Sequence, residues 1–446
     1  MSPRCQTHRL PRRRGMVAVQ VVLMLSMLVG VVALTVDGGM LISERRHVQA
    51  AADAAALAGA VDLFKNYQTG AGLDLTGSAS GVASATATAN YAGDPSNLSM
   101  TIHIPPTSAQ TSYYNNRPGY VEVDLTYNQA RGFSAIWGSS RIPVHAHAIA
   151  RGQWTPADFA ILTLTPTGVG ISVSGGGNVQ ASGGSIFVDS NDATAMKSSG
   201  GSTVSATSIN VVGGVAGGGT MSPTPTTNVT PIQDPLMALA APPPPSAGAY
   251  TKIALGSGNF KYTFSPGSYD GNGGPTIPKL SAGDVAVFKQ ASTNSAGGIY
   301  YLYNGLNSTG ATISMDPLTS GGLMFYNAGT SSSQGLAISG NSSGSVALSG
   351  LDGTVSSTLA YKGLVYFQAR GATEDVSISG NGSFVIEGTI YAPSAALKIT
   401  GNTSVPPSII GSQYIAASLV VGGSGTVLVD HKNSIVTPTR HLKLVE

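Results

Sequence analysis

An uncharged apolar run near the N-terminus, MVAVQVVLMLSMLVGVVALTV at residues 16–36, limits the possible architectures more than any other feature. As an α-helix, its 21 residues would span about 31 Å, the thickness of a bilayer hydrocarbon core. A cleaved signal peptide has a shorter apolar region and a small-residue cleavage site. Here the run is long and is followed by Asp37-Gly38-Gly39. We therefore predict a retained transmembrane helix over 16–36.

The arginines on either side of this run predict its orientation. Five arginines, at positions 4, 9, 12, 13 and 14, precede the run, whereas Arg45 and Arg46 follow it beside acidic residues. Positive charge is retained in the cytoplasm. We expect a single-pass protein with a basic cytoplasmic arm at 1–14, a cytoplasmic N-terminus, and nearly all of its mass exported.

The composition beyond the run favours β-structure. Only 10% of the 446 residues are charged, against about 25% in an ordinary domain. Glycine is abundant, at 58 residues, and 42% of residues are hydrophobic, so many short strands are expected and a disordered chain is excluded. Sparse, dispersed charge also excludes a nucleic-acid surface, which needs clustered phosphate contacts. The single cysteine, Cys5, precludes an intramolecular disulfide.

A specific set of motifs surrounds the apolar run. Arg12-Arg13-Arg14-Gly15 opens it, Asp37-Gly38-Gly39 and Arg45-Arg46 follow, and QAAADAAALAGA ends the series at 49–60. Alanine favours helix and allows close helix packing. Residues 14–60 resemble the TadG-like N-terminal domain of Flp pilus-assembly proteins, from the tight-adherence (Tad) machinery. The resemblance implies an anchor over 15–64, an inner-membrane location, and other Tad components as partners.

Processing of this segment depends on one position. Type IV pilin-like precursors are cut after a glycine that is followed, five residues later, by glutamate. Gly15 is followed at that distance by Gln20, which keeps the shape of glutamate and lacks its charge. We predict an uncut signal anchor, with cleavage after Gly15 as the alternative.

A small α+β unit is predicted over 65–154. An alanine-rich helix is expected within 75–92, and strands at 98–104, 119–127, 133–137 and 142–150. His103, His145 and His147 are the best metal-ligand candidates, since His145 and His147 share one strand face. No cysteine or carboxylate lies beside this pair in the sequence. A zinc site needs three or four ligands, so we predict no metal and no cofactor.

The remainder, 156–446, repeats a short element. Ile338, Ile378 and Ile399 are each followed by Ser or Thr, Gly and Asn, and Val421 precedes two glycines. The last two intervals are 21 and 22 residues, which fits one coil of a parallel β-helix with glycines at its corners. We predict a β-solenoid, loosely resembling bacterial β-solenoid surface proteins. A Pro/Gly-rich excursion is expected at 213–248.

Catalysis has little support in the sequence. Polysaccharide-degrading β-helices gather acids and bases on adjacent coils, and the candidates here are scattered: Asp352, Arg370, Glu374, Asp375 and Glu387. The acidic cluster Asp189-Ser190-Asn191-Asp192 does not match the Asp-x-Ser-x-Ser metal pattern that often accompanies this anchor. We predict a non-catalytic pilus-assembly or cell-envelope scaffold. The alternatives are an adhesin that binds surface glycans through Tyr300, Tyr301 and Tyr303 or, with less support, a polysaccharide-degrading enzyme.

Overall fold

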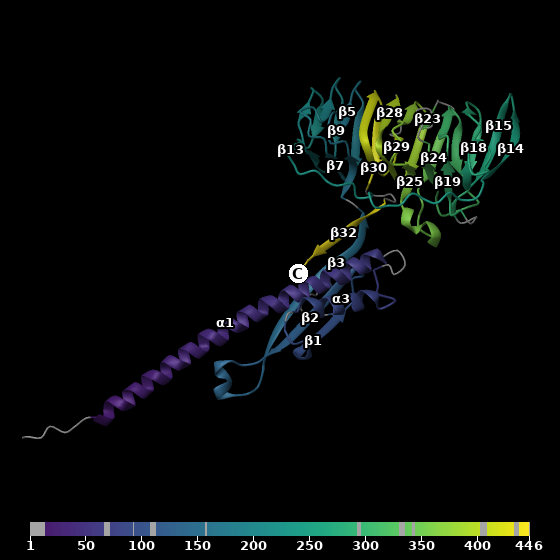
Figure 1. Cartoon of the computed structure of the whole chain (residues 1–446). Helices are drawn as coiled ribbons and strands as arrows, with labels where there is room; N and C mark the ends of the chain where they lie inside the picture. The colour runs from purple at the N-terminus through teal and green to yellow at the C-terminus, as the bar shows by residue number, and fades with distance from the viewer. Residues whose placement is uncertain are drawn as a thin grey trace, which may run out of the picture. The chain divides into compact units, whose positions relative to one another are not determined.

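The computed structural model describes residues 14–66, 72–91, 93–107, 113–156, 158–291, 296–329, 335–340, 344–401, 408–431 and 437–445. The fold is mainly β, with one long apolar helix at the N-terminus (Figure 1). Its described residues form two compact units. The N-terminal unit consists of two segments of the chain, one that ends at Trp154 and one that begins at Arg440. The body comprises residues 155–439. Nearly all of the predicted basic arm, with Cys5, lies outside the described residues.

Helix α1 (Arg14–Lys65) is one continuous helix of 52 residues with two different halves. From Val17 to Val36 almost every side chain is exposed and apolar, and the helix is long and apolar enough to cross a membrane. From Val48 onward one face is buried. This face consists of Val48, Ala51, Ala52, Ala55, Ala56, Ala60 and Leu63. The spacing of three and four residues is that of one helix face.

The buried face of α1 packs on a four-stranded sheet. Helix α3 (Ser78–Asn90) and the strands β1 (Leu98–His103) and β2 (Tyr120–Gln129) fall where the sequence predicted them, and β3 (Ile142–Pro156) extends the fourth prediction. The sheet order is β1-β2-β3-β32. Small residues bring the layers close together. A Cβ added at Gly59 of α1 would lie 3.1 Å from both Ala83 of α3 and Val121 of β2.

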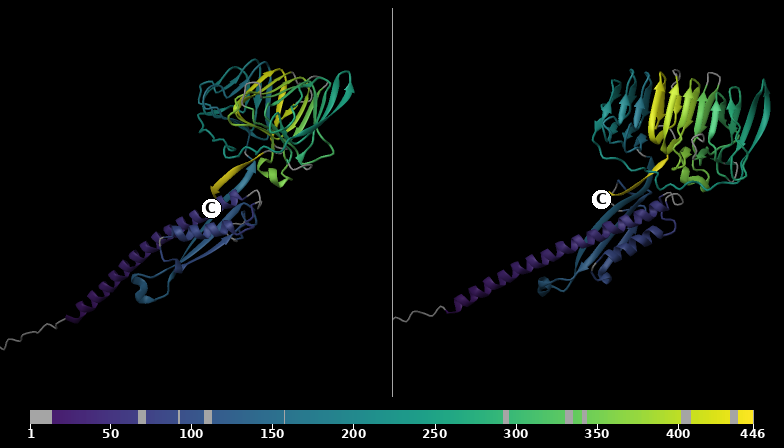
Figure 2. Two further views of the ribbon diagram at one scale, coloured as in Figure 1. Left: turned by 45° about the vertical axis from the view of Figure 1, so that its right-hand side comes forward. Right: turned by 45° about the horizontal axis from the view of Figure 1, so that its top comes forward.

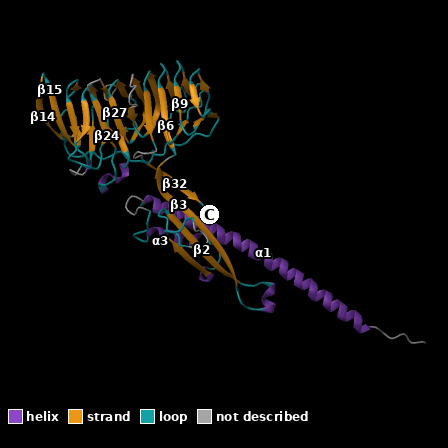
Figure 3. Cartoon of the chain, turned by 180° about the vertical axis from the view of Figure 1, so that it is seen from behind, coloured by secondary structure: helices purple, strands orange, loops and turns teal. Residues whose placement is uncertain are grey.

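Two predictions about this unit are wrong. Residues 133–137, predicted as a strand, form the 3₁₀ helix η3 (Phe133–Trp137), because the carboxylate of Asp37 accepts hydrogen bonds from its first backbone N–H groups. The last residues, predicted to stay in the solenoid, form β32 (Pro438–Leu444) beside β3 (Figure 3). Val445 donates its N–H to Ile149 O at 2.9 Å, so the edge of β3 gains the backbone partners that an open edge lacks.

In the body, successive strands fall into sets, and we call each set that pairs in parallel with the next one a coil. Most coils contribute three short strands. The first coils are β4 (Phe159–Thr163), β5 (Ile171–Val173), β6 (Asn178–Ser182), β7 (Ser185–Val188), β8 (Met196–Ser198), β9 (Thr203–Ser205), β10 (Ile209–Val211), β11 (Val215–Ala216), β12 (Thr220–Ser222) and β13 (Thr226–Thr227). An antiparallel pair follows, β14 (Ala249–Gly256) with β15 (Asn259–Ser265).

The later coils repeat this plan, except that the last two have one long strand where the others have two short ones. They are β16 (Gly267–Tyr269), β17 (Leu280–Ser281), β18 (Val285–Phe288), β19 (Ile299–Leu302), β20 (Leu306–Thr309), β21 (Thr312–Met315), β22 (Met324–Asn327), β23 (Leu336–Gly340), β24 (Ser345–Ser349), β25 (Leu364–Gln368), β26 (Val376–Gly380), β27 (Ser383–Glu387), β28 (Thr389–Gly401), β29 (Ser408–Ile410), β30 (Gln413–Gly423) and β31 (Thr426–Asp430). Among the described residues of the body, the strand pairings other than β14 with β15 are parallel, and the strands form sheets of 17 and 11 strands.

The order of the coils in space differs from their order in the sequence. The last coil, with β30 and β31, pairs in register with the first coil, as in Tyr414 with Ile161 and Val427 with Val179. Figure 2 shows these C-terminal strands, in yellow, beside the first strands of the body. The chain therefore enters and leaves the body at neighbouring coils. The coils formed by strands β4 to β13 lie on one side of this junction, and those formed by strands β16 to β27 lie on the other side.

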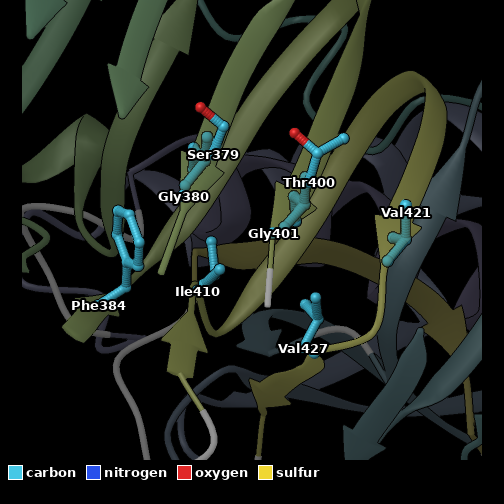
Figure 4. A pocket seen from close by; sticks show the side chains of 12 residues that line it. Ser379, Gly380, Phe384, Thr400, Gly401, Ile410, Val421 and Val427 are labelled. Atoms are coloured by element: carbon cyan, nitrogen blue, oxygen red, sulfur yellow. The ribbon is translucent and has the colours of Figure 1, made fainter. Parts of the chain in front are cut away.

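The predicted stack of the repeated element is confirmed. Ile338 pairs in register with Ile378, Ile378 with Ile399, and Ile399 with Val421, and all four side chains are buried. Gly380 and Gly401, which come two residues after Ile378 and Ile399, lie on the adjacent strands β26 and β28 (Figure 4). An added Cβ at Gly401 would lie 2.0 Å from Gly380 O, so no larger residue fits there. The cavity at this corner measures about 10 Å³, too small for a ligand. Asn402 lies outside the described residues.

The predicted excursion at 213–248 is only partly correct. Its first part forms β11, β12 and β13 within the coils, because glycines there lie directly against the neighbouring coil. A Cβ added at Gly213 would lie 2.1 Å from Asp192 O. Within 228–248 no strand is assigned before β14 begins at Ala249. We call residues 228–248 the strap.

Candidate functional site

The tyrosines predicted to contact a glycan are largely buried by neighbouring side chains. Tyr300 is fully buried inside the coils, and its hydroxyl donates to Lys289 O at 2.7 Å. Tyr301 belongs to an outer ladder with Tyr326, Phe367 and Tyr391, whose successive ring centroids are 4.8, 5.1 and 5.0 Å apart. Tyr303, half-buried, packs on Tyr301. Tyr300 and Tyr301 therefore do not offer open ring faces to a glycan.

The strap packs against the hydrophobic cluster that contains the outer ladder. Leu236 is buried in this cluster, and its carbonyl accepts a hydrogen bond from Arg370 at 2.6 Å. Asp234 accepts one from the Tyr391 hydroxyl, also at 2.6 Å, and Ile232 donates its N–H to Asp189. Burial raises the pKa of Tyr391 above its ordinary value, and the neighbouring carboxylate of Asp234 raises it further. The hydroxyl therefore stays protonated and donates.

The candidate acids and bases of the body have separate structural contacts. Asp375 forms an ion pair with Lys398, and Asp352 accepts from the backbone of Thr354 within its own turn. The backbone carbonyl of Glu374 accepts a hydrogen bond from the Gln368 side chain. Glu387 lies on β27. Asp192 accepts from Thr194. No pair of opposed carboxylates appears among the contacts of these described residues.

The three candidate histidines lie on the sheet of the N-terminal unit. His103 ends β1 and pairs with Glu122 of β2, while His147 of β3 pairs with Asp124 of β2. Glu122 and Asp124 are two residues apart, so they share one face of the sheet. His145 is separate from this group, since its Nδ1 lies 2.9 Å from the Thr126 hydroxyl.

Ligand atoms converge on this face. One nitrogen of His103 and one carboxylate oxygen each from Glu122 and Asp124 lie within 4.8 Å of one another. Glu122 is fully buried, whereas His103 and Asp124 are half-buried. Desolvation raises the pKa of Asp124, and the nearby Glu122 carboxylate adds to this, against the lowering effect of His147 and His103. The cluster is therefore a site where negative charge needs compensation.

The sequence prediction missed both carboxylates. It noted that no carboxylate lies beside His145 and His147 along the chain, but the structure places Glu122 Oε1 3.0 Å from His147 Nε2. The partners come from the neighbouring strand, so only the antiparallel register reveals them. The alternation of Glu122 and Asp124 along one predicted strand face was the available signal.

The motif residues of α1 also have specific contacts. Hydrogen bonds from Ser134 and Phe133 hold the pKa of Asp37 below its usual value. Gln49 donates to His147 O at 2.8 Å, and Glu44 accepts from the Tyr91 hydroxyl at 2.5 Å. Through these contacts, the part of α1 that follows the apolar run is bonded to the rest of the N-terminal unit.

Comparisons with known proteins identify only this segment. No curated protein and no solved structure matches the chain at a significant level. Residues 15–62 match the family described as putative Flp pilus-assembly TadE/G-like, which confirms the resemblance indicated by the motifs of α1.

Proposed function

We propose that the chain is a membrane-anchored, non-catalytic scaffold related to Tad/Flp pilus assembly or to the cell envelope. In this proposal α1 crosses the inner membrane once over residues 16–36, with the N-terminus in the cytoplasm. The α+β sheet and a β-solenoid body lie in the periplasm or outside the cell. Other Tad components are the expected partners.

The observation that carries the proposal is the division of α1 into two halves. Its first half presents apolar side chains on all sides, as a bilayer requires. Its second half buries alanines against α3 and β2. Asp37, the first charged residue after the apolar run, already bonds to η3. A helix that is lipid-facing up to Val36 and packed from Val48 onward is suited to holding a folded unit close to a membrane surface.

The body supports a scaffold role more than an enzymatic one. Its parallel strands stack aliphatic and aromatic residues in register, and its candidate acids and bases make separate contacts. A stack of coils offers a rigid, extended surface. Fold alone supplies no active site, and no group of side chains described in the body has a catalytic arrangement.

A reporter fusion tests the anchor and its orientation. Alkaline phosphatase, active only in the periplasm, would be fused after Glu446, and a cytoplasmic fluorescent reporter would be fused there in parallel. We expect phosphatase activity and no fluorescence. In the matched control, glutamate replaces the five arginines at positions 4, 9, 12, 13 and 14, and phosphatase activity should fall. A fluorescent wild-type fusion with inactive phosphatase would contradict the proposed topology.

Mass spectrometry of the purified protein tests whether the anchor is processed. Because Gln20 stands where pilin-like precursors carry glutamate, we expect the mature chain to retain residues 1–15. Replacing Gln20 with Glu in a host that has a prepilin peptidase is the informative comparison. A wild-type chain that begins at Met16 would overturn the signal-anchor assignment and indicate a pilin-like substrate.

A further inference from the structure

We propose that His103, Glu122 and Asp124 bind a divalent transition-metal ion on the sheet of the N-terminal unit. One imidazole and two carboxylates form a ligand set suited to Zn²⁺ and similar ions. The proposal adds a binding site to the proposed scaffold role and does not depend on that role.

The strand register presents the three ligands together. His103 lies directly opposite Glu122 in the antiparallel pair of β1 and β2. Asp124 is the next residue of β2 on the same face, because side chains alternate along a strand. All three therefore belong to two adjacent strands, whose backbone hydrogen bonds hold them in place. Sites built on strands are held more precisely than sites on loops.

The distances fit ligands around one ion better than direct contacts between the side chains. The three ligand atoms lie within 4.8 Å of one another, yet His103 forms no ion pair or side-chain hydrogen bond with any described residue. Bond lengths of about 2.0–2.2 Å to a shared zinc ion separate its ligand atoms by about 3–4 Å. A small inward movement of half-buried His103 and Asp124 would complete such a site.

Glu122 is oriented from behind by further groups. His147 Nε2 lies 3.0 Å from its Oε1, and Thr107 donates its N–H to Oε2 at 2.9 Å. Metal-binding carboxylates are commonly held by hydrogen bonds of this kind, because these bonds orient the oxygens toward the ion. These two contacts therefore fix the orientation of the fully buried side chain.

The charge of the two carboxylates also favours a cation. Two neighbouring carboxylates in a partly desolvated position repel each other, and a divalent ion would offset both charges. Of the three proposed ligands, Asp124 alone lines an open pocket of about 430 Å³, beside His147, Arg45 and Gln49. Arg45 forms no ion pair with either carboxylate in the described structure. With three protein ligands, the ion would keep at least one position for water.

Zn²⁺ titration of the full-length chain in detergent, with any affinity tag removed, tests the site. Calorimetry should show one strong equivalent of Zn²⁺, and Co²⁺ should give a visible absorption band at the same stoichiometry. His103→Ala and Asp124→Asn should each weaken this binding at least tenfold, since one of three ligands is lost. These two side chains are half-buried, so the variants should fold, which circular dichroism would check. Zn²⁺ should raise the unfolding temperature of the wild type more than that of His103→Ala or Asp124→Asn.

His145→Ala is the matched control, because His145 lies on the same strand as His147 and bonds to Thr126 instead of to the cluster. It should bind Zn²⁺ as the wild type does. Absence of a Zn²⁺ equivalent from the folded wild type would overturn the proposal and leave a histidine–carboxylate hydrogen-bond network. Unchanged binding in both His103→Ala and Asp124→Asn would overturn it as well. The topology assay does not depend on either result.

Discussion

The N-terminal unit and the body bury apolar residues in different ways. In the N-terminal unit, alanines of α1 and α3 cover one face of an antiparallel sheet, and the other face is left for His103, Glu122, Asp124 and His147. In the body, each inner position stacks on its equivalent one coil away, as Ile378 does on Ile399. The first arrangement depends on close approach between unlike elements, whereas the second depends on repetition of like ones.

This difference explains where the titratable groups gather. A sheet covered on one face has another face that tolerates polar residues and brings them together by register. A stacked coil has an interior that accepts only apolar or fully hydrogen-bonded residues. The body accordingly uses aromatic stacks such as Phe264 on Phe288, with ring centroids 4.8 Å apart. Candidate chemistry is therefore found on the smaller unit, and the larger unit supplies extended surface.

The largest expected effect is on the repeated stack of the body. Ile399→Asp would bury an unpaired charge between Ile378 and Val421, so the free energy of unfolding should fall by about 3–5 kcal/mol. Thr400→Asp is the matched control, because Thr400 is the next residue of the same strand and is exposed. Chemical unfolding of the full chain in detergent would measure both. Equal stability of the two variants would show that the stack does not hold the body together.

A smaller effect is expected where α1 meets α3 and β2. Gly59→Leu should destabilise the N-terminal unit by about 1–3 kcal/mol through overpacking, because its Cβ would lie 3.1 Å from Ala83 and Val121. Gly39→Leu on the same helix is the control, since no atom lies within 4 Å of the added Cβ. Thermal unfolding followed by circular dichroism would compare them. A wild-type melting temperature for Gly59→Leu would argue against close packing there.

Loss of one strap contact should have a local effect in the body. Asp234→Ala removes the acceptor of the Tyr391 hydroxyl, which should weaken attachment of the strap by about 1 kcal/mol. Limited proteolysis should then cut within 228–248 several times faster than in the wild type. Asp192→Ala, which loses only contacts within its own turn, should not change the cutting rate. Equal rates for the two variants would show that other contacts hold the strap.

The smallest effect is expected at η3. Asp37→Asn should speed amide exchange of Phe133 and Ser134 by about fivefold, because a charged acceptor is replaced by a weaker neutral one. The pKa of Asp37 is lowered from 3.8. The stabilisation of η3 by the Asp37 carboxylate is therefore fully present above pH 3.8. It is lost as the pH falls through the lower pKa that Asp37 has in the folded state. In the wild type, the protection of these amides relative to their intrinsic exchange rate at the same pH should fall in that acidic range. A pH-independent difference in protection between wild type and variant would refute the carboxylate contact.

Much of the architecture follows from local patterns in the sequence. The uncharged run of α1 and the alanine face beyond it predict a long helix, because helix periodicity and apolar length are properties of neighbouring residues. The motifs around Asp37 indicate the family model that matches residues 15–62. The alternation in β2 and the 21- and 22-residue intervals ending at Val421 predict strands and stacked coils for the same reason.

Only the tertiary structure decided which distant residues meet. The last coil pairs with the first, as Tyr414 does with Ile161, and β32 adds an edge strand beside β3 in the sheet of the other unit. The register of β1, β2 and β3 gathers His103, Glu122, Asp124 and His147 on one face. Strand pairing depends on backbone hydrogen bonds between segments far apart in the chain, and backbone groups are nearly the same in every residue. A single sequence therefore predicts that strands form, while the folded chain determines which strands become neighbours and which side chains share a site.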